Sequence, residues 1–237
     1  MLPETMPVCP VRGSVIYPTM VMPIDAGRPI SIRAIDEALA RDRVLLIVSQ
    51  RDKEVETPRP SDLFEVGTAC NILKMRKNPD GSVQVLVQAF ARVRVREWLD
   101  LGDHLEARGE VLADEPGEPI LVKALVREVK DKFQALLKEG KYLAPEVAQF
   151  ILNLEDPSQL ADYVAFHMDF RLEDKQKVLE TANVAERLRA VLVLLEAELA
   201  LIETQRRIQQ QVKEEIDRNQ REYFLREQMK AIQRELH

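Results

Sequence analysis

The chain is divided by the stretch Ala113-Asp114-Glu115-Pro116-Gly117-Glu118-Pro119, which is rich in proline and in acidic side chains. Seven of the eight glycines and eleven of the thirteen prolines lie within residues 1–119, whereas residues 158–237 contain neither. Glycine and proline form turns and interrupt helices. The sequence therefore predicts strands and turns before this stretch, helices after it, and a linker between them, which is an α+β fold.

The N-terminal half contains strand patterns around one strong turn signal. In Asn78-Pro79-Asp80-Gly81 the proline fixes φ and the glycine accepts a positive φ, so residues 67–77 and 82–90 are predicted to pair as a hairpin. Residues 44–48, Val-Leu-Leu-Ile-Val, are typical of a strand buried on both faces. Residues 92–96 alternate arginine with valine, which predicts a strand with two different faces.

Two further elements complete this half. Helical spacing of Ile32, Ile35 and Leu39 predicts a short helix over residues 31–41, and residues 105–112 can return as another strand. One short helix among five or six mostly antiparallel strands predicts a compact open barrel or sandwich.

The C-terminal half carries helix start and stop signals. An apolar stripe over residues 121–136 ends near Gly140, and Pro145 opens a second, short helix. Asp156, followed by proline and then by glutamine at the third helical position, predicts a capped helix start. Asn183 repeats this arrangement, and the helix that follows has no stop signal before Leu236, a length of about 80 Å.

This last helix changes character near residue 202. A dense apolar stripe precedes that point, whereas residues 203–222 contain only Ile208, Val212 and Ile216 as apolar side chains. So narrow a seam suits an exposed helix that meets another helix along a thin line. Tyr223, Phe224 and Met229 then form an apolar cluster, which we expect to pack in a downstream domain or partner. These six residues are our candidates for oligomerisation or coupling.

Composition restricts the class of protein. The 237 residues carry a net charge of −6, and no region has the basic excess that binding a phosphate backbone requires. No apolar run is long enough to span a bilayer, and the N-terminus has no basic-then-apolar signal segment. Cys9 and Cys70 stand alone in apolar surroundings and are predicted to be reduced core thiols.

Motifs of catalysis are missing from the sequence. The one Gly-Lys pair, Gly140-Lys141, lacks the other residues of a phosphate-binding loop, and no Gly-x-Ser-x-Gly or His-Glu-x-x-His segment occurs. The three histidines are too far apart for zinc-ligand spacing. The sequence therefore predicts neither an active site nor a metal site within these residues.

Residues 220–236 read Gln-Arg-Glu-Tyr-Phe-Leu-Arg-Glu-Gln-Met-Lys-Ala-Ile-Gln-Arg-Glu-Leu. This block resembles the helix that leads into the ATPase module of Lon-family ATP-dependent proteases of the bacterial type. Further similar blocks follow in the family's order at residues 7–12, 17–23, 31–34, 67–69, 79–81, 156–162 and 175–180. One departure is Gln88-Ala89-Phe90, where a Glu-Gly pair is more usual.

The resemblance implies a PUA-like β-domain at residues 1–115, a helical bundle at residues 120–202, and an exposed helix end at residues 203–237 that leads to the ATPase module. It implies the recognition region of a cytoplasmic, hexameric protease that degrades misfolded, unfolded and regulatory proteins. The family's nucleotide-binding motifs and Ser-Lys dyad have no matching positions here. ATP and magnesium are therefore expected only in the ATPase module, and neither ATP hydrolysis nor peptide cleavage is expected of these 237 residues.

A domain that binds unfolded polypeptides needs an exposed apolar surface with adaptable side chains. The candidates for such contacts are Tyr17, Met20, Met22 and Phe64, against the simpler interpretation that each is an ordinary core residue.

Two other functions are kept as alternatives. PUA-like folds often bind RNA, and Arg92, Arg94 and Arg96 are the best support for such a role. The acidic balance of this half opposes that role, and we favour arginines that cover apolar surface and pair with carboxylates between residues 100 and 110. The second alternative is a pure scaffold, in which the long helix sets the oligomeric state.

Overall fold

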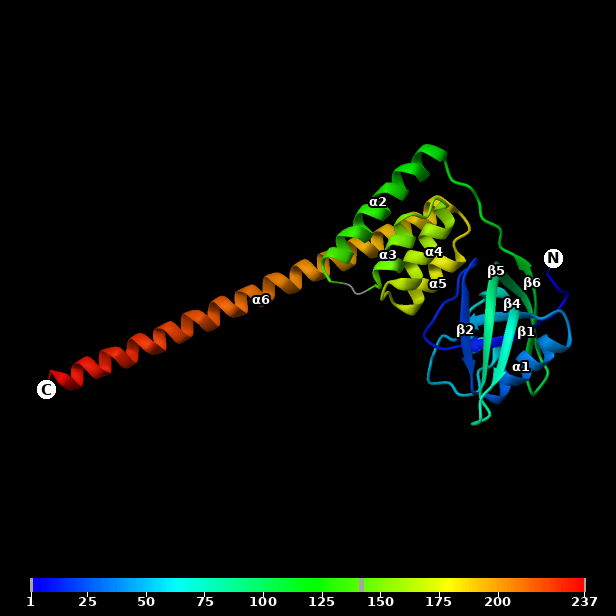
Figure 1. Cartoon of the computed structure of the whole chain (residues 1–237), viewed down its shortest axis with the longest axis horizontal. Coiled ribbons are helices and arrows are strands. Elements are labelled where there is room, and N and C mark those ends of the chain that lie inside the picture. Colours follow the sequence, from blue (N-terminus) through cyan, green and yellow to red (C-terminus); the bar gives the residue numbers. More distant parts are fainter. Residues whose placement is uncertain (1, 141–142, 237) are drawn as a thin grey trace.

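The computed structural model describes residues 2–140 and 143–236, and it has the predicted α+β fold. Figure 1 shows a curled sheet at one end, a cluster of helices beside it, and one long helix that projects far beyond both. The strands are β1 (Met6–Val11), β2 (Val21–Ala26), β3 (Val44–Ser49), β4 (Val66–Lys77), β5 (Val83–Asp100) and β6 (Leu105–Val111). The helices are α1 (Pro29–Ala40), α2 (Pro119–Lys138), α3 (Pro145–Leu152), α4 (Pro157–His167), α5 (Leu172–Glu180) and α6 (Val184–Glu235).

The sheet is built around the long strand β5. The strand order is β2-β5-β4-β3-β1-β6, and the last part of β5 pairs with β6 as well. Only β1 and β3 are parallel, and the other pairings are antiparallel. Because β6, at the far end of this order, pairs back with β5, the sheet curls, and β2 pairs with the other part of β5 alone, which gives the predicted open barrel.

The turn and hairpin of the sequence analysis are confirmed. Gly81 has φ +86°, and β4 and β5 pair on either side of it from Lys77↔Val83 onward. Residues 92–96 continue β5, which therefore runs for 18 residues. Helix α1 packs its buried face, Ala34, Ile35 and Ala38, against apolar side chains of the sheet.

The β-half and the helical half share one apolar core. Val15, Tyr17, Met20 and Val66 from the β-half pack in the same cluster as the buried faces of α2, α4, α5 and the start of α6. Two further apolar clusters lie within the β-half. The linker after β6 therefore connects halves that are in direct contact.

Helices α4 and α6 begin where they were predicted to begin, each after a side chain that caps the helix. Asp156 accepts from the Gln159 N–H at 3.0 Å, and Asn183 accepts from the Glu186 N–H at 3.1 Å. Helix α2 ends before Gly140, whose φ is +87°. Helix α5 was not predicted. Its N-cap residue Arg171 makes no side-chain capping bond, so the sequence contains no start signal for this helix.

Helix α6 has a packed part and an exposed part. Side chains up to Leu195 include five that are buried in the shared core, together with the buried Arg187, whereas every described side chain from residue 203 to 236 is exposed. An ion pair joins Arg206 of this exposed part to Glu139 at the end of α2. The helix spans 52 residues, in agreement with the predicted single long helix.

Gly67 is expected to be required for the contact between β3 and β4. A Cβ atom at this position would lie 2.5 Å from the Ile47 carbonyl oxygen and 2.7 Å from Val48 Cγ2. Gly67→Ala should therefore lower the free energy of unfolding by about 2 kcal/mol in a denaturant titration. Gly27→Ala is the control, because nothing lies within 4 Å of its Cβ position, and its effect should stay within about 0.5 kcal/mol. Equal stability of the two variants would contradict this account.

Candidate binding site

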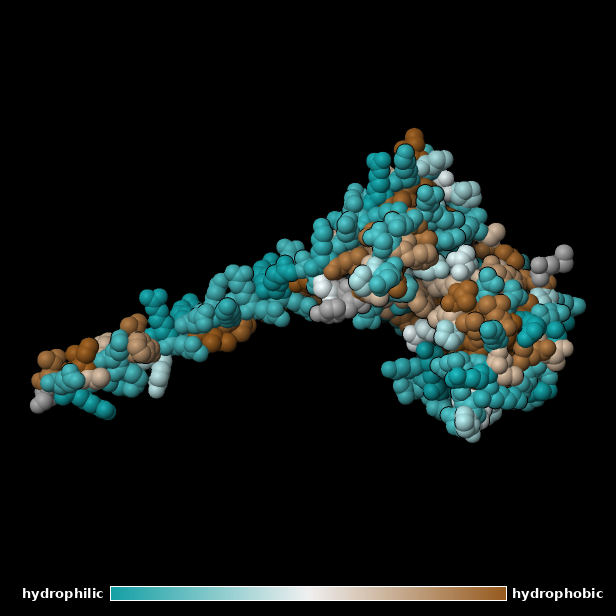
Figure 2. Space-filling model, viewed as in Figure 1, coloured by the Kyte–Doolittle hydropathy of each residue, from teal (hydrophilic) through white to brown (hydrophobic). Residues whose placement is uncertain are grey.

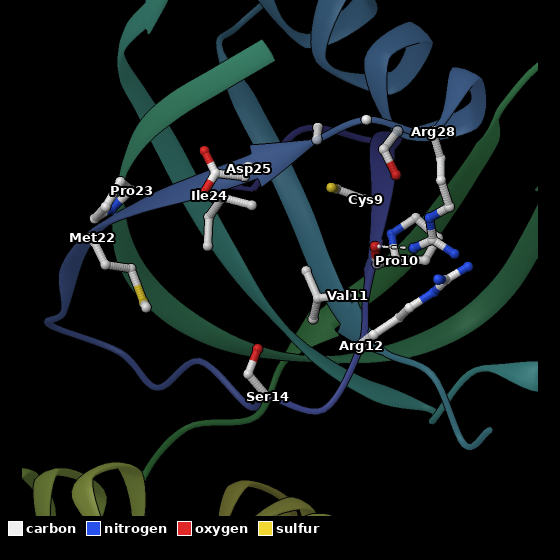
Figure 3. Close-up of a pocket in the computed structure, with 13 residues that line it drawn as sticks. Cys9, Pro10, Val11, Arg12, Ser14, Met22, Pro23, Ile24, Asp25 and Arg28 are labelled. Carbon is white, nitrogen blue, oxygen red and sulfur yellow. Dashed lines mark hydrogen bonds between the residues drawn. The ribbon is translucent and has the colours of Figure 1, made fainter. Parts of the chain in front are cut away.

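A groove lies between β1 and β2, where the open barrel is not closed by strand pairing. Strand β2 ends the sheet order and pairs only with β5, so its other edge has no neighbouring strand. Figure 3 shows β1 and β2 on opposite sides of the resulting pocket, which has a volume of about 370 Å³. Its lining combines apolar side chains, among them Val11, Met22 and Ile24, with the guanidinium groups of Arg12 and Arg28.

Charged groups hold the β1 side of this groove in place. Arg28 donates to the Pro10 carbonyl oxygen at 2.8 Å and to the side-chain oxygen of Gln50. Burial, followed by the nearby Arg12, lowers the pKa of Arg28. Arg12 in turn pairs with Glu56 at 3.0 Å. The arginines therefore anchor the wall of the groove to the loop that follows β3.

The cysteine in this groove is a core residue. Burial raises the pKa of the Cys9 thiol to about 11, so the thiol is neutral near pH 7 and is not an activated nucleophile. Burial raises the pKa of Cys70 as well, and both cysteines are free and buried. The burial confirms the prediction that both cysteines are core residues.

The structure corrects most of the predicted apolar contact surface. Tyr17 and Met20 are buried where the two halves meet, and the Tyr17 hydroxyl donates to the Lys175 carbonyl oxygen at 2.8 Å. Phe64 is only 9% exposed and lies under the guanidinium of Arg51. These three side chains fill the core, so the expectation that they form an exposed surface is wrong. Met22 alone of the four is half-buried and lines the groove.

Other apolar side chains of the β-half are exposed instead. Val21, Leu73 and Phe90 belong to the neighbouring strands β2, β4 and β5, and they are 54%, 43% and 38% exposed. These three residues are not among those predicted from the sequence. The sequence does contain a signal that β2 is an edge strand. Pro23 interrupts an otherwise strand-like run, and proline within a sheet is confined to edge strands and bulges.

The arginine stripe divides into residues with different roles. Arg92 is 3% exposed and pairs with the equally buried Asp162 of α4, so it cannot contact RNA in this structure. Its carboxylate partners come from the linker and the bundle, and the expectation that they come from residues 100–110 is wrong for Arg92. That expectation is correct for Arg96, which is exposed and pairs with Glu110. Arg94 is half-exposed.

Arg92 belongs to a buried ion cluster that was not predicted from the sequence. Arg187, at the start of α6, is fully buried and donates to Asp114 at 2.7 Å, to Ser158 at 2.6 Å and to the Thr181 carbonyl oxygen at 2.9 Å. Burial raises the pKa of Asp162 to about 6, against the opposing effect of Arg92 and Arg187. The cluster therefore links β5, the linker, α4 and α6 at one point.

The predicted coupling residues on α6 are all exposed. Ile208, Val212 and Ile216 lie one turn apart and are 50–53% exposed, and Tyr223, Phe224 and Met229 are 61–69% exposed. Figure 2 shows apolar side chains gathered at two places along the projecting helix, with polar side chains between them. Two separate apolar patches on this helix are therefore available to a partner.

The described part of the chain contains neither a group of metal ligands nor a helix that could span a membrane. Within residues 2–140 and 143–236, no group of three or more His, Cys, Asp or Glu side chains is placed to hold a metal ion. Among the helices of those same residues, none combines the length and the apolar character needed to cross a bilayer.

The fold and the groove define a binding domain of two packed halves, extended by a long helix. A family model described as the ATP-dependent protease La (LON) substrate-binding domain matches residues 5–197, and the chain belongs to this family.

Related proteins and structures agree with that assignment. The chain is 41% identical over 230 residues to the Lon protease of Escherichia coli strain K12, and 38% identical over 237 residues to Lon protease 2 of Bdellovibrio bacteriovorus. These matches cover 97% and 99% of the chain but only 29% and 30% of those proteins, so the chain spans less than a third of their length.

Solved structures show the same fold. The N-terminal domain of Mycobacterium avium complex Lon protease matches with a TM-score of 0.68 and 26% identity, over 81% of this chain and 98% of that one. A Lon N-terminal domain protein from Xanthomonas campestris matches with a TM-score of 0.54 at 13% identity, which supports the fold alone.

Proposed function

We propose that these 237 residues recognise substrates and assist assembly for a cytoplasmic ATP-dependent protease that degrades misfolded, unfolded and regulatory proteins. The observation that carries this proposal is the match of a substrate-binding domain family to residues 5–197. In this proposal the residues do no chemistry of their own, and ATP and magnesium act in an ATPase module outside them.

The parts of the chain have separate tasks in this proposal. The β-domain (residues 1–115) contacts unfolded substrates through the groove at β2 and the exposed apolar side chains of β2, β4 and β5. The bundle (residues 120–202) holds the β-domain through the shared core and the ion cluster. The helix end (residues 203–237) connects both to a hexameric motor through its two apolar patches.

The RNA alternative loses its main support. Of its three arginines, Arg92 is buried and ion-paired, and Arg96 is paired with Glu110. A single half-exposed arginine on an acidic half is a weak electrostatic footprint for RNA.

Binding to one protein in two states tests the proposal. The chain should bind reduced, carboxymethylated α-lactalbumin, which stays unfolded, and should bind native α-lactalbumin at least about tenfold more weakly, since specificity is a difference of affinities. Fluorescence anisotropy of labelled α-lactalbumin measures both. Equal binding to the two forms, or binding to neither, would contradict the proposed function.

A further inference from the structure

The free edge of β2 has a defined pattern of hydrogen-bonding groups. Thr19 has φ +71°, its N–H donates to the Ala89 carbonyl oxygen, and the Ala89 N–H donates to the Met20 carbonyl oxygen. This is the bonding of a β-bulge with its first residue in the left-handed region, so Met20 forms the first bonded pair with β5.

From that point, the register decides which backbone groups face outward. Residues of an antiparallel strand alternate between bonding their partner and facing away. Met20 bonds to β5, so the backbone groups of every second residue after it also point toward β5. These residues are Met22, Ile24 and Ala26, in register with Val87, Val85 and Val83. Val21, Pro23 and Asp25 therefore direct their backbone groups away from the sheet. They offer three carbonyl oxygens and, since proline has no N–H, two N–H donors.

The opposite wall of the groove does not offer such an edge. Pro10 of β1 has no N–H, and its carbonyl oxygen already accepts from Arg28 at 2.8 Å. Figure 3 shows this bond on the β1 side of the pocket, across from Met22 and Ile24 of β2. A strand that enters the groove can therefore pair with β2 only.

We propose that an extended segment of unfolded polypeptide binds by adding a strand to the free edge of β2. This inference rests on the proposed function and specifies how the substrate is held. Unfolded proteins differ in side chains but share backbone N–H and C=O groups, which are the groups that this edge complements. Alternate side chains of the added strand would contact exposed Val21 on one face and Met22 in the groove on the other.

Pro23 limits the strand pairing at this edge to short, reversible contacts. Long, flat strand edges join copies of a protein into aggregates, and natural proteins interrupt them with proline or charge. Here the proline removes one donor in the middle of a six-residue strand, and Asp25 places a charge beside it, in a hydrogen bond with Gln84 at 2.9 Å. Such an edge holds a client segment weakly enough to release it.

Amide hydrogen exchange, followed residue by residue by NMR, tests the geometry. In the free chain, the Val21 and Asp25 amides should exchange fast and the Met22 and Ile24 amides slowly. Saturating reduced, carboxymethylated α-lactalbumin should slow exchange at Val21 and Asp25 by about fivefold or more, because these amides become bonded. Unchanged exchange at both residues while the client is bound would overturn the proposal.

Paired substitutions separate the backbone from the side chain. Val21→Pro and Asp25→Pro remove an outward N–H, and each should weaken client binding about fivefold. Val21→Ala and Asp25→Ala remove the same side chains but keep the N–H, so each proline variant is compared with its alanine variant. Near-ultraviolet circular dichroism confirms that all four variants are folded.

The outcomes distinguish this proposal from the proposed function. Equal loss of affinity in proline and alanine variants would replace strand addition with side-chain binding and would leave the proposed function intact. Absence of client binding in the unaltered chain would remove both. Concentration-dependent protection of Val21 and Asp25 without client would identify a second copy of the chain as the occupant and would also overturn the proposal.

Discussion

Replacing Arg92 with methionine is expected to lower the free energy of unfolding by about 3–5 kcal/mol, because it leaves the buried Asp162 carboxylate without its closest partner. Arg187 remains at 3.9 Å from that carboxylate and cannot replace the direct bond. The Leu179 carbonyl oxygen, which accepts from Arg92 at 3.1 Å, loses its donor as well. Chemical denaturation measures the loss.

The same strand supplies the controls for this prediction. Arg94→Met and Arg96→Met alter half-exposed and exposed members of the same arginine stripe, and each should change stability by less than about 1 kcal/mol. The double variant Arg92→Met with Asp162→Leu removes both buried charges and should be more stable than Arg92→Met alone. If the single and double variants unfold alike, the ion pair is not the source of the loss.

The pH dependence of this variant follows from Asp162. Burial raises the pKa of Asp162 to about 6, and Arg92 opposes that rise, so removing Arg92 raises it further. A carboxyl whose folded-state pKa exceeds its unfolded value binds protons more tightly when folded, so its contribution to stability is lost as pH rises. The difference between Arg92→Met and the unaltered chain should therefore narrow when the pH falls from 7.5 to 5.5.

Local signals in the sequence were sufficient for the ends of several elements. Asp156 and Asn183 bond to backbone amides three residues away, and Gly81 and Gly140 adopt the positive φ that their positions require. Such features depend on residues close together in the chain, so a sequence without an alignment predicts them.

Contacts between distant segments explain what the sequence could not show. Arg92, Arg94 and Arg96 have the same spacing, but only Arg92 lies where α4 meets the sheet, and its partner is 70 residues away. The Tyr17 hydroxyl bonds to a residue 158 positions further on. The docking of the helical half onto the β-half determines which apolar and charged side chains are buried. No local pattern in the sequence encodes that docking.

Removing residues 203–237 is expected to leave the stability of the rest unchanged while abolishing association through α6. Every described side chain in that segment is exposed, and it is tied to the bundle by a surface ion pair between Arg206 and Glu139. The free energy of unfolding of residues 1–202 should therefore stay within about 0.5 kcal/mol of the full chain. Sedimentation velocity should show weak dimers of the full chain at high concentration and only monomers of residues 1–202.

Substitutions within α6 assign this effect to its apolar seam. Changing Ile208, Val212 and Ile216 together to glutamine should weaken the association, because these three are the apolar side chains of residues 203–222. Gln209, Lys213 and Asp217 have the same spacing one residue further on, and their change to alanine should leave association intact. A seam that is covered by the bundle in solution would instead make the glutamine variant less stable without altering its oligomeric state, and the helix would then be part of the folded core.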